Sequence, residues 1–170
     1  EETVRIDGIV FTSRMLRLNL AAAERVFPFV ATCGHELDEA GPSAGEMLES
    51  FWWDAIKEAV LACARRRFEN LLRHRFRLAR TSGMAPGSGD AGVWPIEQQQ
   101  QLFALLGDVR GRIGVTLTSS CLMIPNKSVS GIRFASERDF RTCQVCRRES
   151  CPGRQAPFDR GLWEEMRQSR

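Results

Sequence analysis

A long helical pattern in the first half of the chain constrains the fold more than any other feature. The tetrapeptide Ser43-Ala44-Gly45-Glu46 has the spacing of a capping box, which marks a helix N-terminus. Apolar residues then recur every three or four positions, as one face of a helix requires, at Leu48, Trp52, Ile56, Ala59 and Cys63. We therefore predict a helix that runs to about Arg80 and buries this stripe, with Cys63 as a small buried side chain rather than a ligand.

Shorter elements before and after this helix predict an α+β fold. Strand-like patterns cover residues 3–12, 26–32, 113–117 and 129–134. Shorter helical patterns cover residues 15–25, residues 95–106 and a terminal stretch from about residue 159. Ser13 suits the N-cap of the first short helix, Pro28 favours an edge strand, and Gly107 ends the second helix. Strands and helices that do not alternate strictly are typical of α+β domains.

The composition is that of one globular domain. The chain has 170 residues, of which 43% are hydrophobic and 26% are charged, a balance typical of folded proteins. No apolar run approaches the length of about 18 residues that a membrane span needs. Because no secretion signal opens the sequence, we expect a reducing, cytoplasmic environment and no membrane partner.

Positive charge is concentrated between residues 62 and 80, where seven arginines are accompanied by one acidic residue, Glu69. The net charge of +3 is too small to indicate nucleic-acid binding, and no nucleic-acid motif accompanies these arginines. Two interpretations of the arginines stay open. They form a solvated helix face, or a surface that meets an acidic partner or a phosphate.

Three of the six cysteines form a close run that suits a metal. Cys143, Cys146 and Cys151 have the spacing C-x2-C-x4-C, which favours thiolates converging on one centre over disulfides. An iron–sulfur cluster is the first interpretation, zinc is the second, and three unliganded thiols are the third. Cys121 is the first candidate for a fourth ligand, and Cys33 or His35 is the alternative.

Geometry makes this cysteine hypothesis specific. Metal–thiolate bonds are only about 2.3 Å long, so the three sulfurs are expected to face one point. The nearby cations Arg147, Arg148 and Arg154 would offset the negative charge of a thiolate-bound centre. We expect residues 141–170 to form a cysteine-motif segment that packs on a core of residues 1–140 within a single domain.

Three sequence features occur together in an order that resembles a known family. An acidic helix pattern at Asp54 and Glu58 is followed by the loop Ala85-Pro86-Gly87 and then by a helix. The segment GVTLTSSCLMIPNKSVSG follows at residues 114–131. This order is similar to the activation domain of cobalamin-dependent methionine synthase, and to small stand-alone relatives that carry a cysteine tail. The resemblance covers residues 26–154, and its most specific part runs from Pro125 to Gly131.

The resemblance implies a twisted antiparallel sheet with flanking helices, and docking against a corrinoid-bearing partner. In the family, the docked domain covers cob(II)alamin while the cofactor is reduced and remethylated. The implied cofactor-facing residues are Asp54, Glu58, Arg80, Ala85, Pro86, Gly87, Met123, Pro125, Ser128, Ser130 and Gly131. Ser128 and Ser130 would offer hydroxyls to the amide side chains of the corrinoid, and Gly131 would permit close approach. From the residues alone, these hydroxyls equally suit a local turn.

The resemblance is weakest where the family binds S-adenosylmethionine. The family loop has the form R-x-x-x-G-Y-P, and Gly87 matches its glycine. Gly83 stands at the arginine position, Ser88 at the tyrosine position and Gly89 at the proline position. The arginine that would grip a carboxylate is therefore missing unless Arg80 replaces it. We expect weak or absent S-adenosylmethionine binding.

These features together predict a reactivation partner rather than a complete enzyme. The partner would be a cobalamin-loaded methionine synthase or a related corrinoid methyltransferase, served by an electron donor protein. An iron–sulfur cluster beside the corrinoid would relay electrons to it. The competing hypothesis, from a different class of protein, is a structural or regulatory interaction domain stabilised by zinc or by a cluster.

Overall fold

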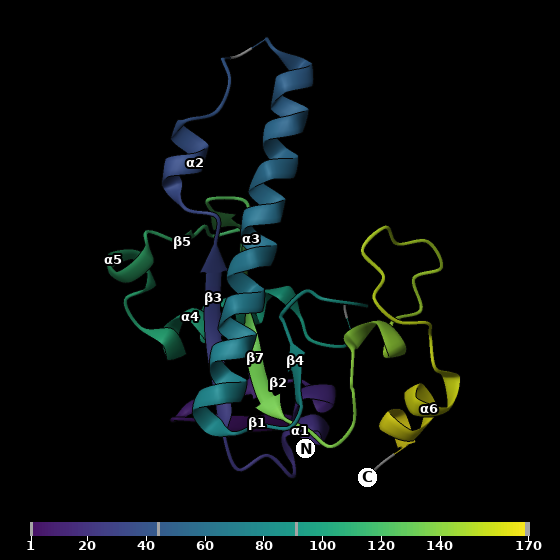
Figure 1. Ribbon diagram of the computed structural model, residues 1–170. Helices are drawn as coiled ribbons and strands as arrows, with labels where there is room; N and C mark the ends of the chain where they lie inside the picture. Colours follow the sequence, from purple (N-terminus) through teal and green to yellow (C-terminus); the bar gives the residue numbers. More distant parts are fainter. Residues whose placement is uncertain (1, 44, 91, 169–170) are drawn as a thin grey trace.

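A three-stranded antiparallel sheet lies at the centre of the structure, a computed structural model that describes residues 2–43, 45–90 and 92–168. Its strands are β3 (Val26–Thr32), β7 (Ser128–Ala135) and β4 (Thr81–Met84), in the order β3-β7-β4. Helices surround this sheet (Figure 1), and the predicted α+β class is confirmed. The sequence did not predict β4, because its four residues, TSGM, were interpreted as the break after the long helix and the start of the next loop.

β7 is the central strand, and its two faces meet different neighbours. Ile132 and Phe134 on one face are fully buried in the main hydrophobic cluster. Side chains alternate along a strand, so Arg133 points to the opposite face, where it lies opposite Gly83 of β4. β3 is an edge strand, as Pro28 predicted.

The first residues form a hairpin where the sequence analysis predicted a single strand. β1 (Thr3–Ile6) pairs antiparallel with β2 (Ile9–Thr12). Between them, Asp7 and Gly8 have φ angles of 45° and 85°. Two successive positive φ angles are typical of tight hairpin turns, and an Asp-Gly pair is a common sequence signal for them.

Ser13 caps α1 (Arg14–Leu20), as predicted, by accepting a hydrogen bond from the Leu16 N–H at 3.0 Å. The side chain of Ser13 also donates to the carbonyl of Val93 at 2.6 Å. This second bond links the N-terminal part of the chain to the loop between β4 and η1 (Ile96–Gln98). The bond lies next to Trp94, which is fully buried. One polar side chain therefore fixes both a helix start and a long-range contact.

The long predicted helix is present as α3 (Met47–Phe76), which has 30 residues. It ends earlier than Arg80, because Arg77 adopts a left-handed conformation with a φ of 53° and stops the helix. The predicted capping box is wrong as well. The N-cap is Glu46, and no side chain caps it. Ala44, within the predicted box, lies outside the described residues.

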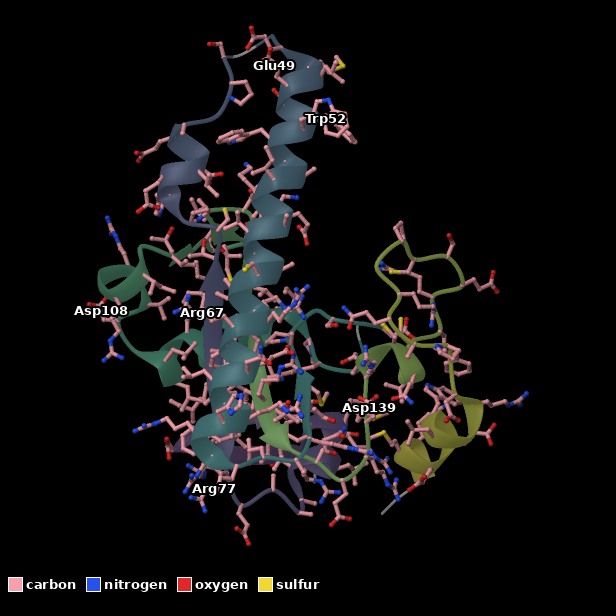
Figure 2. The ribbon with its side chains drawn as sticks, in the orientation of Figure 1. Glu49, Trp52, Arg67, Arg77, Asp108 and Asp139 are labelled. Carbon is pink, nitrogen blue, oxygen red and sulfur yellow. The ribbon has the colours of Figure 1, made fainter. Side chains whose placement is uncertain are left out.

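The predicted buried stripe of α3 is also wrong. Leu48, Trp52 and Ile56 are 68%, 60% and 46% exposed, and Cys63 is exposed too. Figure 2 shows Trp52 on the side of α3 that faces away from α2 (His35–Glu39). Apolar residues occupy more than one side of this helix, so their spacing did not identify the side that meets the sheet.

A different side of α3 packs on the protein. Leu61 and Leu72 are buried, and Phe68 stacks on Phe29 of β3 with ring centroids 5.0 Å apart. Towards the N-terminus of the helix, α2 lies beside α3 (Figure 1), where Trp53 donates its indole N–H to the carbonyl of Leu37 at 2.7 Å. The helix is therefore held along one line of contacts and leaves an apolar outer side free.

Five short elements connect β4 to β7 along the chain. Between β4 and β7 lie η1 (Ile96–Gln98), α4 (Gln99–Leu106), α5 (Val109–Ile113), β5 (Thr116–Leu117) and β6 (Met123–Ile124). Gly107 ends α4, as predicted. Of the strand predicted over residues 113–117, only β5 is found, because α5 begins at an Asp108 cap.

The C-terminal segment contributes to the same hydrophobic cluster as the sheet. It contains η2 (Thr142–Val145) and α6 (Arg160–Gln168). Phe140, Val145 and Met166 are buried in the main cluster together with β7 residues. In the part of the chain that the structure describes, no helix has the length and apolar character needed to cross a membrane.

Two neighbouring leucines of α3 test which side of the helix is buried. Leu72 is 6% exposed and Leu71 is 60% exposed. We expect Leu72→Ala to lower the free energy of unfolding by about 2–4 kcal/mol, because it leaves a cavity against the sheet. Leu71→Ala should change it by less than about 0.5 kcal/mol. Urea denaturation of both variants measures this difference, and equal losses would contradict the packing described.

Candidate functional site

A cavity of about 1000 Å³ opens where the sheet, α3 and the C-terminal segment meet. Its lining comes from β3, α3, β4, the loop after β4, the β5–β6 hairpin, β7 and the segment around η2. Among the residues implied by the family resemblance, the following line it: Ala85, Pro86, Gly87, Met123, Ser128 and Ser130. Segments that lie far apart in the sequence are thus brought to one place.

The loop after β4 is tightly fixed. The Ser88 N–H donates to the carbonyl of Ala85 at 3.1 Å, and the Gly87 N–H donates to that of Trp94 at 2.8 Å. Gly87 has a φ of 75°, and a Cβ atom there would lie 2.5 Å from Cδ1 of Ile96. A side chain at position 87 would therefore be both strained and crowded, so this glycine shapes the cavity wall.

The two serines of β7 differ in what they offer the cavity. Ser128 donates its hydroxyl to the carbonyl of Pro125 at 2.7 Å, and its Oγ lies 2.9 Å from Oγ1 of Thr32. This hydroxyl closes a local turn, the alternative that the residues alone left open. Ser130 lines the cavity but is only 2% exposed. Neither serine presents a freely exposed hydroxyl.

Gly131 and Pro125 support the cavity without lining it. A Cβ atom on Gly131 would lie 2.6 Å from the carbonyl oxygen of Met84, so the glycine permits close contact between β7 and β4. Pro125 is fully buried. The close approach implied for Gly131 is therefore made to a neighbouring strand inside the protein.

Asp54 and Glu58 also lie outside the cavity lining, but they are linked to its most specific segment. Asp54 pairs with Nζ of Lys127 at 2.7 Å, and Glu58 approaches the same atom at 3.7 Å. The hydrogen bond from Lys127 to Asp54 raises the pKa of the lysine above its ordinary value. These carboxylates hold the turn that precedes Ser128 against α3, which explains why the acidic helix pattern accompanies this segment.

Arg80 does not replace the missing arginine of the family loop. It is exposed and absent from the cavity lining. Arg133 instead occupies the space beside Gly83, where a Cβ atom would lie 2.8 Å from its Cδ. Arg133 forms an ion pair with Glu69 of α3. Burial lowers the pKa of Arg133, and the charges of Arg65 and Arg141 lower it further.

Arg65, Glu69, Arg133 and Arg141 line the cavity, and the sequence analysis did not single them out as site residues. Arg65 and Glu69 had been noted only as members of the charged stretch of the long helix. A signal was available for Arg133, because a charged residue between Ile132 and Phe134 on a buried strand needs a partner.

Exposed apolar side chains surround the same cavity. Leu122, Ile124 and Ile96 belong to its lining and are 66%, 47% and 40% exposed. Large apolar groups gathered at the edge of a cavity are typical of interaction sites. The cavity therefore combines several charged groups with an apolar rim, as a surface that meets a large partner does.

Comparison with known families identifies the family of this chain. A family model described as the activation domain of vitamin B12 dependent methionine synthase matches residues 54–149, more than half of the 170 residues. The chain belongs to this activation-domain family. Membership associates it with the B12-dependent methionine synthase system and implies a role in reactivation. A search of curated proteins found no match.

The family match covers all of the residues that the resemblance implied as cofactor-facing, from Asp54 to Gly131, but it stops short of Cys151. Cys121 and Cys143 line the cavity, whereas Cys146 and Cys151 do not. Cys33 and His35 lie at the far end of β3, where His35 Nε2 is 2.6 Å from the carbonyl of Gly114. Burial raises the pKa of the Cys33 thiol, and the charge of Asp38 raises it further.

The predicted convergence of the three sulfurs is not found. Within residues 2–43, 45–90 and 92–168, no group of three His, Cys, Asp or Glu side chains is arranged to hold a metal ion. The described residues therefore form no ready-made site for a cluster or for zinc, and the metal site stays a prediction.

The segment is organised around Arg154 instead. Its guanidinium donates to the carbonyls of Cys143 and Ala156, both at 3.2 Å, to that of Cys146 at 3.4 Å, and to that of Arg148. Arg154 was expected to offset thiolate charge. It binds backbone oxygens of the cysteine run, and so closes the loop between η2 and α6.

Replacing Arg154 tests this organisation. We expect Arg154→Met to lower the local opening free energy of residues 143–156 by about 1–3 kcal/mol, because several carbonyls lose a charged donor. Arg148→Met is the matched control, since the Arg148 side chain is exposed. Hydrogen exchange followed by mass spectrometry measures both. Unchanged protection in Arg154→Met would show that something else holds the loop.

Proposed function

We propose that this chain docks on a corrinoid-bearing module of a B12-dependent methionine synthase or a related methyltransferase and assists the reactivation of its cobalamin. Family membership supports the type of partner. The carrying observation is the cavity itself, which joins the loop at residues 85–87 with Met123, Ser128 and Ser130 inside an apolar rim. An electron donor protein belongs to the same proposal, because reduction of cob(II)alamin requires one.

The residues of this chain would act by binding and by excluding water. Cobalamin on the partner supplies the redox and methyl-transfer chemistry. Leu122 and Ile124 would cover apolar surface of the partner and keep water from the contact, where most binding energy is concentrated in a few well-packed groups. Lys127, held by Asp54, would keep the turn at Pro125 in place during docking. Both contributions are positional, and neither requires a reacting group on this chain.

We infer that S-adenosylmethionine contributes little binding energy here. The segment from Gly83 to Gly89 lacks the arginine and the tyrosine of the family motif. S-adenosylmethionine also carries a positively charged sulfonium, which Arg65 and Arg141 near the same wall would repel. Docking itself does not depend on this ligand.

A charge placed on the rim tests docking directly. We expect Leu122→Asp to weaken binding to a cobalamin-loaded methionine synthase at least tenfold, about 1.4 kcal/mol, because it places a carboxylate in the apolar contact. Leu71→Asp is the matched control, since Leu71 is similarly exposed, at 60% against 66%, and is absent from the cavity lining. Isothermal titration calorimetry measures both affinities.

Two outcomes of that titration would count against the proposal. One is the absence of binding to any corrinoid protein of the source cell. The other is an equal loss of affinity in both variants, which would place the contact elsewhere.

The second candidate function is a structural or regulatory domain stabilised by a metal. The spacing of Cys143, Cys146 and Cys151 supports it, with an iron–sulfur cluster as the first candidate and zinc as the alternative. A cluster would also supply the electron relay of the docking proposal. Because the described residues do not bring three ligands together, we derive no electron-transfer step through this run.

Metal analysis of anaerobically purified protein tests this second function. If the run binds a metal, Cys146→Ala should lose it, because each thiolate supplies a bond that the others cannot replace. Cys63→Ala should retain it, since Cys63 is exposed on α3. Elemental analysis and visible absorbance give the result, and a metal-free, colourless parent protein would exclude the site.

A further inference from the structure

Three arginines from separate segments border the cavity near the wall formed by β4 and β7. Arg65 comes from α3, Arg133 from β7, and Arg141 from the residue before η2. The charges of Arg65 and Arg141 both lower the pKa of Arg133, so each of these two guanidinium groups is close enough to Arg133 to repel it. A fold holds like charges together at a cost, which a bound anion would offset.

Two carboxylates lie beside these three arginines, so the negative charges do not balance the positive ones. Glu69 pairs with Arg133, and Asp139 lies 3.6 Å from Nε of Arg141, where both side chains are largely exposed. Figure 2 shows Asp139 on the segment that leads from the sheet to the C-terminal part. Arg65 is different, because its Nε is buried and has no hydrogen-bond partner among the described residues. The described residues also give Arg65 no carboxylate partner, so a bound anion would balance a charge that they leave unpaired.

Gly83 leaves room for the side chain of Arg133. Gly83 lies directly opposite Arg133 in the sheet, and a Cβ atom on it would lie 2.8 Å from Cδ and 3.0 Å from Nε of Arg133. A side chain at position 83 would therefore push the Arg133 guanidinium away from its present place along the cavity wall. This links the anion-facing groups to the sheet by sterics as well as by charge.

We propose that the cavity holds a phosphate group, free or as part of a small phosphate ester, between Arg65, Arg133 and Arg141. A planar carboxylate is satisfied by the fork of one guanidinium. Donors that approach from three separate segments suit a tetrahedral anion with more acceptor oxygens and about two negative charges. The site lies within the cavity of the proposed docking surface, but it is a property of the isolated chain and does not depend on docking.

Titration of the isolated chain with inorganic phosphate tests the site, at constant ionic strength so that general screening is the same throughout. Arg65→Gln should weaken phosphate binding at least tenfold. Arg67→Gln, on the exposed side of the same helix (Figure 2), should leave it within twofold. Isothermal titration calorimetry gives the affinities, and circular dichroism confirms that each variant is folded.

Two further variants separate charge from sterics. Gly83→Ala removes no charge, yet it should weaken phosphate binding, because the added methyl group displaces Arg133. Arg141→Gln removes one positive charge from the cavity lining and should also weaken phosphate binding. If Gly83→Ala fails to fold, the two glutamine variants still decide the question.

The choice of probe identifies the ligand class. Tighter binding of glycerol 3-phosphate than of inorganic phosphate would identify a phosphate ester, and the reverse order would identify the free ion. Acetate or malonate binding as tightly as phosphate would overturn the proposal, and so would an equal loss in Arg65→Gln and Arg67→Gln. Because the measurement needs no corrinoid partner, its failure is distinct from a failure of docking.

Discussion

The organisation of this protein depends on the central position of β7. Hydrogen-bonded to β3 on one side and to β4 on the other, the strand has no free edge over the length that both neighbours cover. Ile132 and Phe134 then anchor the hydrophobic cluster from one face, and Arg133 reaches α3 from the other. The eight residues of β7 therefore contribute both to the hydrophobic cluster and to the cavity wall. A substitution that disturbs this strand is expected to affect stability and the cavity together.

Elements with a local chemical signal were predictable from the sequence. Ser13 was recognised as a cap because a hydroxyl before an apolar-periodic stretch satisfies a helix N–H, and it does so here. Gly107 and Pro28 were predictable for similar local reasons. The buried side of α3 was not, because Trp52 and Leu72 belong to two apolar sides of one helix, and only the position of the sheet decides between them.

The residues of the candidate site also fall into those that a local motif identified and those that only long-range contacts reveal. The segment from Pro125 to Gly131 and the loop at Gly87 were identified because each is a compact motif. Asp54 carried little weight alone, and its contact with Lys127, 73 residues later in the sequence, is what gives it a role. Arg133 was missed because its significance comes from Gly83 and Glu69, which long-range pairing brings to it. Spacing within one segment does not contain that information.

In the cysteine segment, one charged side chain links separate parts of the loop through their backbone oxygens. A run of cysteines is usually interpreted through its sulfur atoms. Here the guanidinium of Arg154 instead binds the backbone oxygens of Cys143 and Cys146. An arginine with several donors in a rigid plane can close a loop in this way without any change of oxidation state.

The contact between Gly83 and Arg133 has an evolutionary consequence. Because the two positions face each other across adjacent strands, a large side chain at one excludes a large side chain at the other. The resemblance to the family places an arginine at position 83, whereas this chain carries its arginine on the neighbouring strand. Among relatives, the two positions are therefore expected to covary, with the guanidinium supplied from either strand but not from both. A search for the arginine by sequence position alone would miss such an exchange, while the register of the sheet preserves its place in space.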